Sequence, residues 1–358
     1  MSLTRREVLG AAGAALGSAL LSGCLAGNDE TPQMDINSSD SFNSSNLNED
    51  QSYKRHGVAL LSSLKAKDEI CRTREKQGRV ETLEYQTHSY VYEEANPGTE
   101  VIVTKKLNVW LPAGYNPKLA HKVVYLLHGT GQMQDYWLGD QETFGEACHG
   151  AETRGILDGM VEEVLLTNVI VVTPTYYSMP EEDIPTTVDG FFSEPYADRW
   201  PMLFYKELRE TIIPLVESTY LCGSHGDVSE EALIKSRGRR AFAGLSRGSM
   251  ATVNSVMMHC SDLFSYYGCF SGVWADFDEF KAIYEDDYAG DSVVFWYNGN
   301  GTRDFSLENH QEFCQKALDQ IPNGFVNGAN FAWVCFNGGD HNYESWACHL
   351  YNALLCFF

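Results

Sequence analysis

The hydrophobic pattern of the chain alternates short apolar runs with longer amphipathic stretches. Several short runs are apolar throughout, which is typical of central strands that are covered on both faces of a sheet. We predict strands at residues 99–112, 121–129, 168–174, 239–246, 266–272, 292–300 and 331–339. Apolar residues near helical spacing predict helices at 202–220, with a kink at Pro214, at 312–321 and at 345–358.

Strands that alternate with helices along the chain predict an α/β fold, a mostly parallel central sheet with helices on both faces. Ligands bind such sheets at the carboxyl ends of the strands. Two stretches, 178–200 and 222–238, look like insertions near that edge. The sequence shows no internal repeat and no second domain boundary, so we expect residues 56–358 to form one domain.

The N-terminus has a different pattern. Arg5 and Arg6 precede a run of small apolar residues that ends in LSGC, which is typical of a twin-arginine export signal with a lipidation site at Cys24. An ordinary buried helix is the alternative interpretation. We expect residues 1–23 to be a signal peptide and residues 24–55, rich in Asn, Ser and Asp, to be a flexible tether. The protein would then be an exported, cell-surface lipoprotein that meets the membrane only through its lipid.

Composition narrows the possible partners. The chain has 358 residues, 49 of them acidic and 26 basic, for a formal charge of -23. Such a surface repels phosphate, so we expect no nucleic-acid partner. Ten cysteines, or nine without Cys24, make disulfides conceivable after export, but their pairing does not follow from the sequence. The spacing of cysteine and histidine has no metal-ligand signature, so we expect no metal and no cofactor.

The chemistry centres on a G-x-S-x-G motif, Gly244 to Gly248, between a predicted strand and a predicted helix. A tight strand-to-helix turn pushes the serine hydroxyl clear of the backbone, and a Cβ at either glycine would collide within it. A serine that merely caps the helix does not explain the two flanking glycines. We therefore predict that Ser246 is a nucleophile.

A serine nucleophile needs a base that takes its proton. His341 follows the last predicted strand and two glycines, which would let a loop bring its imidazole over the serine. We predict that His341 is this base. His259, His310 and His349 fall within helical patterns, where packed or solvated side chains are expected.

An acid should hold the other imidazole nitrogen, and hydrolases with this motif have the chain order serine, acid, histidine. Asp304 follows the predicted strand 292–300, and we favour it as the acid. Its alternative role is that of an exposed helix-starting aspartate. Asp276 and Asp278 lie one strand earlier and remain rivals.

An oxyanion hole needs backbone N–H groups that point at the developing charge. The residue after the nucleophile, Arg247, supplies one amide. The early loop from His128 to Gly131 should supply the second. We favour the amide of Thr130, with Gly129 next.

With these motifs in place, the chain resembles the feruloyl esterase branch of the esterase D-like hydrolases, of carbohydrate esterase family 1 type. The resemblance rests on the segments 78–85, 107–117, 123–137, 169–175, 243–250, 301–304 and 338–346. It implies an α/β-hydrolase fold with Ser246, Asp304 and His341 as the triad and the amides of Thr130 and Arg247 as the oxyanion hole. The chain departs from the family at Arg247, where methionine or glutamine is usual, at Ser249, where glycine is usual, and in a Gly-Asp-His order before the base.

The resemblance implies a secreted serine esterase that acts on ester-decorated plant polysaccharide or on phenolic esters. Aromatic residues near the loops could stack on a phenolic acid or a sugar, or could simply be packing: Tyr136, Trp137, Trp274, Phe305 and Trp346. An esterase for acetylated xylan or another small ester is the alternative enzyme. A surface-binding lipoprotein with an inactive site is a third possibility, but it predicts a missing triad member.

Overall fold

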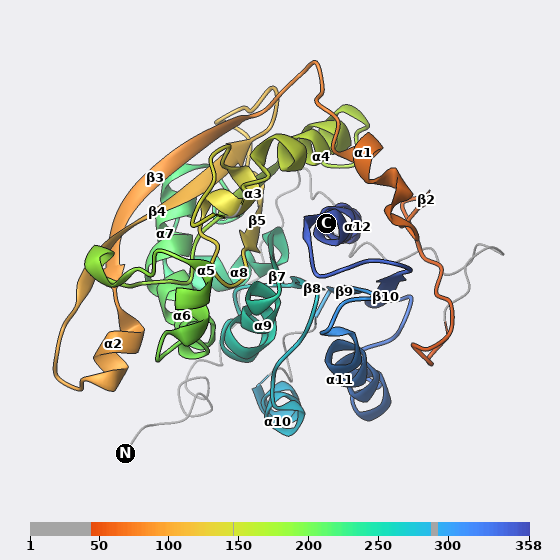
Figure 1. Cartoon of the computed structure of the whole chain (residues 1–358). Coiled ribbons are helices and arrows are strands. Elements are labelled where there is room, and N and C mark those ends of the chain that lie inside the picture. The colour runs from red at the N-terminus through yellow and green to blue at the C-terminus, as the bar shows by residue number, and fades with distance from the viewer. Residues whose placement is uncertain (1–43, 146, 288–292) are drawn as a thin grey trace, which may run out of the picture. The chain divides into compact units, whose positions relative to one another are not determined.

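One eight-stranded sheet runs through the protein in the order β10-β9-β8-β7-β5-β6-β4-β3 (Figure 1). The strands are β3 (Arg79–His88), β4 (Ile102–Leu111), β5 (Lys122–Leu127), β6 (Val169–Thr173), β7 (Arg240–Leu245), β8 (Tyr266–Phe270), β9 (Phe295–Gly301) and β10 (Phe331–Phe336). Strand β4 is antiparallel to both of its neighbours, and the other adjacent pairs are parallel. The predicted mostly parallel sheet is confirmed.

The structure is a computed structural model that describes residues 44–145, 147–287 and 293–358. The predicted signal peptide, Cys24 and the first part of the predicted tether lie outside these residues. Each of the seven predicted strands corresponds to a strand of the sheet. The strand β3 was not predicted, because it lies at the sheet edge and its side chains alternate between half-buried and exposed positions.

Helices cover both faces of the sheet, as predicted (Figure 1). The described helices are α1 (Lys67–Ile70), α2 (Tyr90–Ala95), α3 (Asp135–Leu138), α4 (Gly150–Glu162), α5 (Val188–Ser193), α6 (Arg199–Glu207), α7 (Ile213–Thr219), α8 (Glu230–Lys235), α9 (Arg247–Ala251), α10 (Phe277–Asp287), α11 (Leu307–Gln320) and α12 (Tyr343–Cys356). One buried cluster joins α6, α7, α10 and α11 to the sheet, and a second joins α1, α3, α4 and α12 to its other face. A sheet buried on both faces explains why its central strands are apolar throughout.

The predicted helix 202–220 is interrupted. Helix α6 passes through a π-type turn at Leu208–Ile212 into α7, with Pro214 in the first turn of α7. Proline lacks an N–H and its ring clashes with the preceding turn, so the wider turn lies where the helix must give way.

The two predicted insertions lie at opposite ends of the parallel strands. Residues 178–200 follow β6 and lie at the carboxyl ends of the strands, as predicted. Residues 222–238 precede β7 and lie at the amino ends, so the prediction that they border the ligand-binding edge is wrong. Cys222 pairs there with His121, at the start of β5. The polar composition of residues 222–238 indicated an insertion, but it could not indicate at which end of the strands the insertion lies.

The predicted tether is shorter than expected at its C-terminal end. Residues 44–55 pack against the domain, and Leu47 and Tyr53 are each only 3% exposed. The Tyr53 hydroxyl donates to Asn327 Oδ1 at 2.8 Å, and the amide of Trp333 donates to that hydroxyl at 3.0 Å. Three buried side chains, those of Leu47, Tyr53 and Arg55, thus anchor a stretch whose composition is otherwise that of a tether.

All nine cysteines that the structure describes are free thiols. Seven of them are buried, and burial raises the pKa of thiols such as Cys71 and Cys260 to about 12. A protonated, buried thiol is a poor nucleophile and a poor metal ligand, so these cysteines act as small core residues.

Candidate active site

Ser246 lies on the sharp turn between β7 and α9, with φ +51° and ψ −118°. A non-glycine residue in this region is strained by about 1–3 kcal/mol, so the surrounding structure must impose it. A Cβ at Gly248 would lie 2.5 Å from the carbonyl oxygen of His128, and one at Gly244 would collide with the backbone of Gly248. Both glycines are therefore required by close backbone approach, as the motif predicted.

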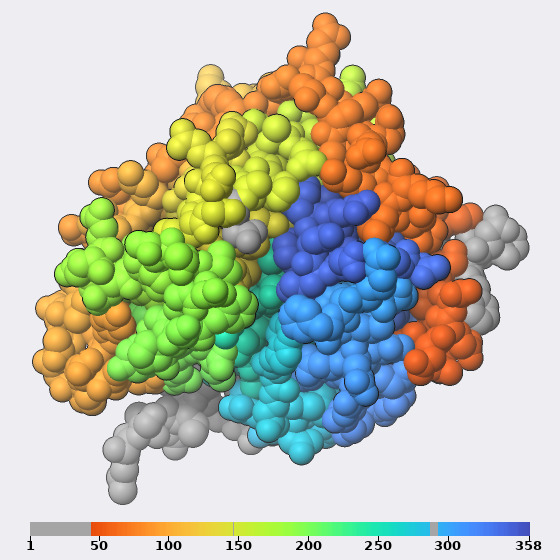
Figure 2. Space-filling model, in the orientation of Figure 1, coloured from red at the N-terminus to blue at the C-terminus, as the bar shows by residue number. Residues whose placement is uncertain are grey.

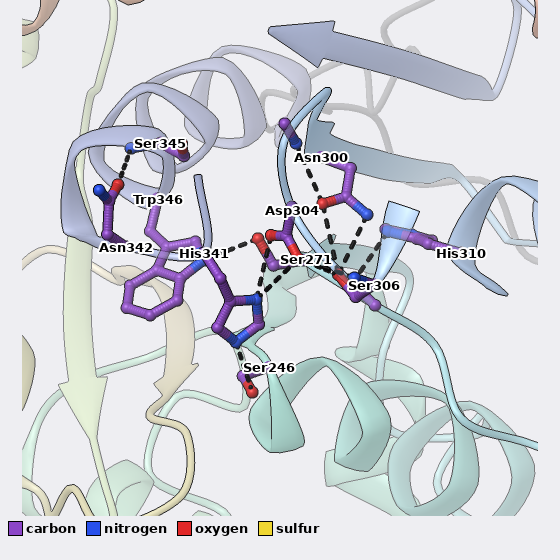
Figure 3. Close-up of polar contacts among 12 residues, drawn as sticks. Ser246, Ser271, Asn300, Asp304, Ser306, His310, His341, Asn342, Ser345 and Trp346 are labelled. Carbon is purple, nitrogen blue, oxygen red and sulfur yellow. Dashed lines mark hydrogen bonds and ion pairs between the residues drawn. The ribbon is translucent and has the colours of Figure 1, made fainter. Parts of the chain in front are cut away.

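Two loops at the same sheet edge bring an acid and a base to this serine (Figure 3). The Asp304 loop follows β9, and the His341 loop joins β10 to α12. The loops are bound to each other because the amide of Arg303 donates to the carbonyl oxygen of Gly339 at 2.9 Å. Asn342 then caps α12, with its side chain accepting a hydrogen bond from the amide of Ser345. The backbone on either side of the imidazole is thus fixed.

Ser246, His341 and Asp304 form one chain of hydrogen bonds. The Ser246 hydroxyl lies 3.0 Å from His341 Nε2, where it can donate. His341 Nδ1 lies 2.9 and 3.0 Å from the two carboxylate oxygens of Asp304. This arrangement can remove the proton from a serine hydroxyl and stabilise the imidazolium that results.

Asp304 is held in its ionised form. Burial alone would raise its pKa, but the hydrogen bond and the charge of His341, together with two hydrogen bonds from Ser306, lower the pKa to about 2. The Asp304 side chain is fully buried and that of His341 is 20% exposed. The carboxylate is therefore shielded, while the imidazole remains open to a ligand.

The rival residues lie elsewhere. Asp276 accepts a hydrogen bond from the amide of Glu279 and so caps α10. His310 and His349 are packed in the core, where burial lowers the pKa of each to about 3. His259 stacks on the ring of Tyr205. His341 is the histidine that contacts Ser246.

Asp340, which directly precedes His341, connects the two loops. Its carboxylate pairs with Arg303 of the Asp304 loop, with 3.0 Å between Arg303 Nε and Asp340 Oδ1. Both side chains are about half exposed, so this pair links the two loops at the surface. The reversed order leaves His341 facing the serine.

The early loop presents backbone amides beside Ser246. The Gly129 amide donates to Gln132 Oε1 at 2.8 Å, and the Gly131 amide donates to the Tyr177 hydroxyl at 3.3 Å. Within the described parts of the chain, the amides of Thr130 and Arg247 have no such partner. The geometry thus favours Thr130 over Gly129 as the second oxyanion donor.

A buried histidine fixes this loop. His128 Nδ1 donates to the carbonyl oxygen of Gly129 at 2.7 Å, and its Nε2 accepts from the Thr175 hydroxyl at 2.8 Å. Burial lowers the pKa of His128 to about 3, so the ring stays neutral and can make both bonds. This role of His128 was not predicted from the sequence, where the only signal is the His-Gly pair at 128–129.

The predicted aromatic contacts divide into core and surface residues. Tyr136 and Trp137 are 3% and 1% exposed and pack in the core, so the prediction that they contact a substrate is wrong. Trp346 is also buried; its ring contacts that of His341 nearly at a right angle, and its Nε1 donates to Ser271 Oγ at 2.8 Å. Trp274 is half-buried. Phe305 is 75% exposed, with its ring centre 4.4 Å from that of His341.

The insertion 178–200 forms one wall beside the serine. Val188 packs closely on Gly131: a Cβ added to Gly131 would lie 2.9 Å from the Cγ1 of Val188. The Arg247 guanidinium, absent from the usual family pattern, donates to the carbonyl oxygen of Ala197 and to Asp198 Oδ1, each at 2.8 Å. A cavity of about 600 Å³ lies along this wall. In Figure 2 the green surface of this segment faces the blue surface of the C-terminal third across a recess.

Comparison with known proteins assigns the family. The sequence model of the Esterase family matches residues 103–357. The chain belongs to this family. This esterase is therefore a carboxylic ester hydrolase with an α/β-hydrolase fold. The sequence-based assignments of fold and enzyme class are confirmed.

The most informative relatives are esterases and an esterase-containing xylanase. The chain is 28% identical over 266 residues to endo-1,4-beta-xylanase Y of Acetivibrio thermocellus, covering 71% of this chain but only 22% of that protein. The feruloyl esterase module of Clostridium thermocellum, in complex with sinapinate, is 24% identical with a TM-score of 0.65, over 86% of this chain and 96% of the module. A ferulic acid esterase of Anaeromyces mucronatus is 22% identical with a TM-score of 0.60, over 83% and 97%. These structures share the fold of this chain.

The described residues also bear on membrane spanning and metal binding. No helix within 44–145, 147–287 or 293–358 has the length and hydropathy needed to cross a bilayer. In the same residues, no group of three His, Cys, Asp or Glu side chains is placed to hold a metal ion.

Proposed function

We propose that this esterase is a serine hydrolase that releases ferulate or a related hydroxycinnamate from esterified plant polysaccharide. The hydrogen-bonded chain Ser246–His341–Asp304 carries the proposal, because this geometry gives a serine its base and the base its acid. The related xylanase and the ferulic acid esterases support the substrate class.

Catalysis would proceed through an acyl-enzyme. Ser246 Oγ attacks the ester carbonyl carbon as its proton passes to His341 Nε2, and the amides of Thr130 and Arg247 bind the resulting oxyanion. The intermediate collapses as His341 returns the proton to the leaving alcohol oxygen. Water then attacks the acyl carbon with His341 as base, and the carboxylic acid leaves as the Ser246 hydroxyl is restored. The chemistry uses side chains and backbone amides of this chain alone.

The same proposal places the enzyme outside the cytoplasm. The twin-arginine pattern and the LSGC run support export and lipid attachment at Cys24. Expression with labelled palmitate tests this: the natural chain should carry label in the membrane fraction, and Cys24→Ser should not. Label retained by Cys24→Ser would contradict the anchor.

The activity test uses the chain from residue 25 and two esters. Ferulate release from methyl ferulate, abolished in Ser246→Ala and retained in the control Ser218→Ala, is the expected result. Ser218 is an exposed serine whose hydroxyl bonds only to the backbone of its own helix. Release of acetate alone from acetylated xylo-oligosaccharide would keep the mechanism and replace the substrate class. Turnover unchanged in Ser246→Ala would contradict the mechanism.

A further inference from the structure

A groove of about 610 Å³ begins at Phe305, whose ring contacts that of His341, and runs along α11. Phe305 stands at the end nearest the imidazole, and Glu308, Gln311, Gln315 and Asp319 follow along one face of the helix at spacings of three and four residues. At about 1.5 Å of rise per residue, the helix face from 307 to 319 extends the groove to about 18 Å. That length suits a short chain of sugar rings better than a single small group.

The groove has a second, fixed wall. Residues 44–51 lie against α11, where Gln311 Nε2 donates to Asn48 Oδ1 at 3.1 Å and Gln315 Oε1 accepts from the amide of Leu47 at 3.0 Å. Figure 2 shows the red-orange surface of this segment beside the blue surface of α11. The part of the chain that was expected to be a tether therefore helps to shape the groove.

The direction of the reaction assigns the occupant. His341 must return its proton to the leaving oxygen, so the alcohol part of the ester lies on the histidine side of Ser246. Phe305 borders that side, with its ring centre 4.4 Å from that of His341 and 75% of its surface exposed. Phe305 therefore lies between the position of the leaving group and the groove along α11.

The chemistry of the lining fits a neutral sugar chain. An exposed aromatic ring can cover the apolar face of a pyranose, and the carboxylates of Glu308 and Asp319 can accept hydrogen bonds from hydroxyl groups. Lys316 is neutralised by Glu312 at 2.7 Å, which leaves Glu308 and Asp319 as net negative charge. An anionic chain would be repelled.

We infer that this groove binds the neutral carbohydrate chain that carries the scissile ester, with Phe305 as its first stacking surface. The inference rests on the proposed function and extends it, because it assigns the leaving group to a surface of its own. The methyl group of methyl ferulate is too short to extend along the groove beyond Phe305.

The test compares kcat/KM for a feruloylated arabinoxylo-oligosaccharide with kcat/KM for methyl ferulate, as a ratio. Phe305→Ala should lower the ratio about three- to tenfold, the loss expected for one aromatic contact. Gln311→Trp, which fills the groove, should lower it more than tenfold. The matched control Asn309→Trp changes an exposed residue of α11 that borders a neighbouring hollow, and it should leave the ratio unchanged.

The outcomes separate the inference from the proposed function. If wild type cleaves methyl ferulate and the ratio stays constant in Phe305→Ala and Gln311→Trp, the groove is not the carbohydrate site. An equal loss on both esters, as a merely displaced His341 would give, also overturns the inference. If wild type cleaves neither ester, the proposed function itself fails. Neutral xylo-oligosaccharide should also inhibit cleavage of the larger ester more strongly than oligogalacturonate, and the reverse order would contradict the neutral assignment.

Discussion

Replacing Asp304 by asparagine tests how the acid controls the base. The Asp304 carboxylate accepts a hydrogen bond from His341 Nδ1 and two from Ser306. An asparagine at this position has nearly the same shape, but its amide group can donate to Nδ1. The proton of the neutral imidazole would then move to Nε2, and Nε2 could no longer accept the proton of Ser246.

The expected loss is large because two effects combine. The base is held in the wrong tautomer, and the imidazolium formed during attack loses a fully buried counter-charge. The corresponding change in a serine protease of unrelated fold lowers kcat about ten-thousandfold, equivalent to about 5 kcal/mol in the barrier. We expect a loss of this order, with KM changed by less than about threefold, since Asp304 lies behind the imidazole.

The assay is steady-state hydrolysis of methyl ferulate by wild type and Asp304→Asn, with thermal unfolding as the folding control. A folded variant that retains more than a tenth of the wild-type kcat would refute the assignment of Asp304. In that case Asp276→Asn and Asp278→Asn should be measured next, because these were the rival acids of the sequence analysis.

Four further predictions follow from the same contacts. The pKa of Asp304 is about 2, against an ordinary value of 3.8, so its stabilising effect is complete above pH 3.8 and disappears as the pH falls to 2. Between pH 5 and pH 2, the free energy of unfolding in urea should therefore fall by on the order of 2 kcal/mol more for wild type than for Asp304→Asn, and equal decreases would contradict this. Gly248→Ala should destabilise by about 1–3 kcal/mol and abolish activity, because the new Cβ meets backbone; a stable, active variant would be inconsistent with the turn. Thr175→Val removes the hydrogen-bond donor to His128 Nε2, so the free energy of unfolding should fall by about 1–3 kcal/mol and kcat should fall by a larger factor than KM changes. A change in KM alone would argue against a role of this contact in the oxyanion loop. Arg247→Met keeps the backbone amide but removes the guanidinium contacts to Ala197 and Asp198, so kcat/KM for methyl ferulate should fall about tenfold, chiefly through a higher KM. A decrease in kcat alone would indicate instead that the guanidinium takes part in the reaction.

The fold could be predicted from the sequence where burial produces an uninterrupted run of apolar residues. Strands such as β5 and β7 are buried on both faces, so their apolar runs identify them directly. The edge strand β3 has no such run. The position of residues 222–238 depends on the strand end to which they connect. The packing of residues 44–55 depends on a few side chains, mainly the buried Leu47, Tyr53 and Arg55. Neither feature leaves a periodic signal.

The candidate site could be predicted where the spacing of residues reflects a steric requirement of the backbone. Gly244 and Gly248 allow a tight turn that side chains at these positions would block, so the motif and its place between a predicted strand and a predicted helix identified Ser246. The contribution of Tyr136 was misjudged, because the first turn of α3 points its ring into the core. Phe305 follows the predicted acid directly in the sequence, but its exposure depends on the fold of the loop.

The most direct test of the central claim is to trap the acyl-enzyme. Methyl ferulate is mixed with enzyme, the reaction is quenched in acid within milliseconds, and the protein is analysed by intact-mass and peptide-mapping spectrometry. We expect one feruloyl group on the peptide that contains Ser246, and no such group in Ser246→Ala. Ferulate release without a protein adduct, or an adduct on any other residue, would contradict the account.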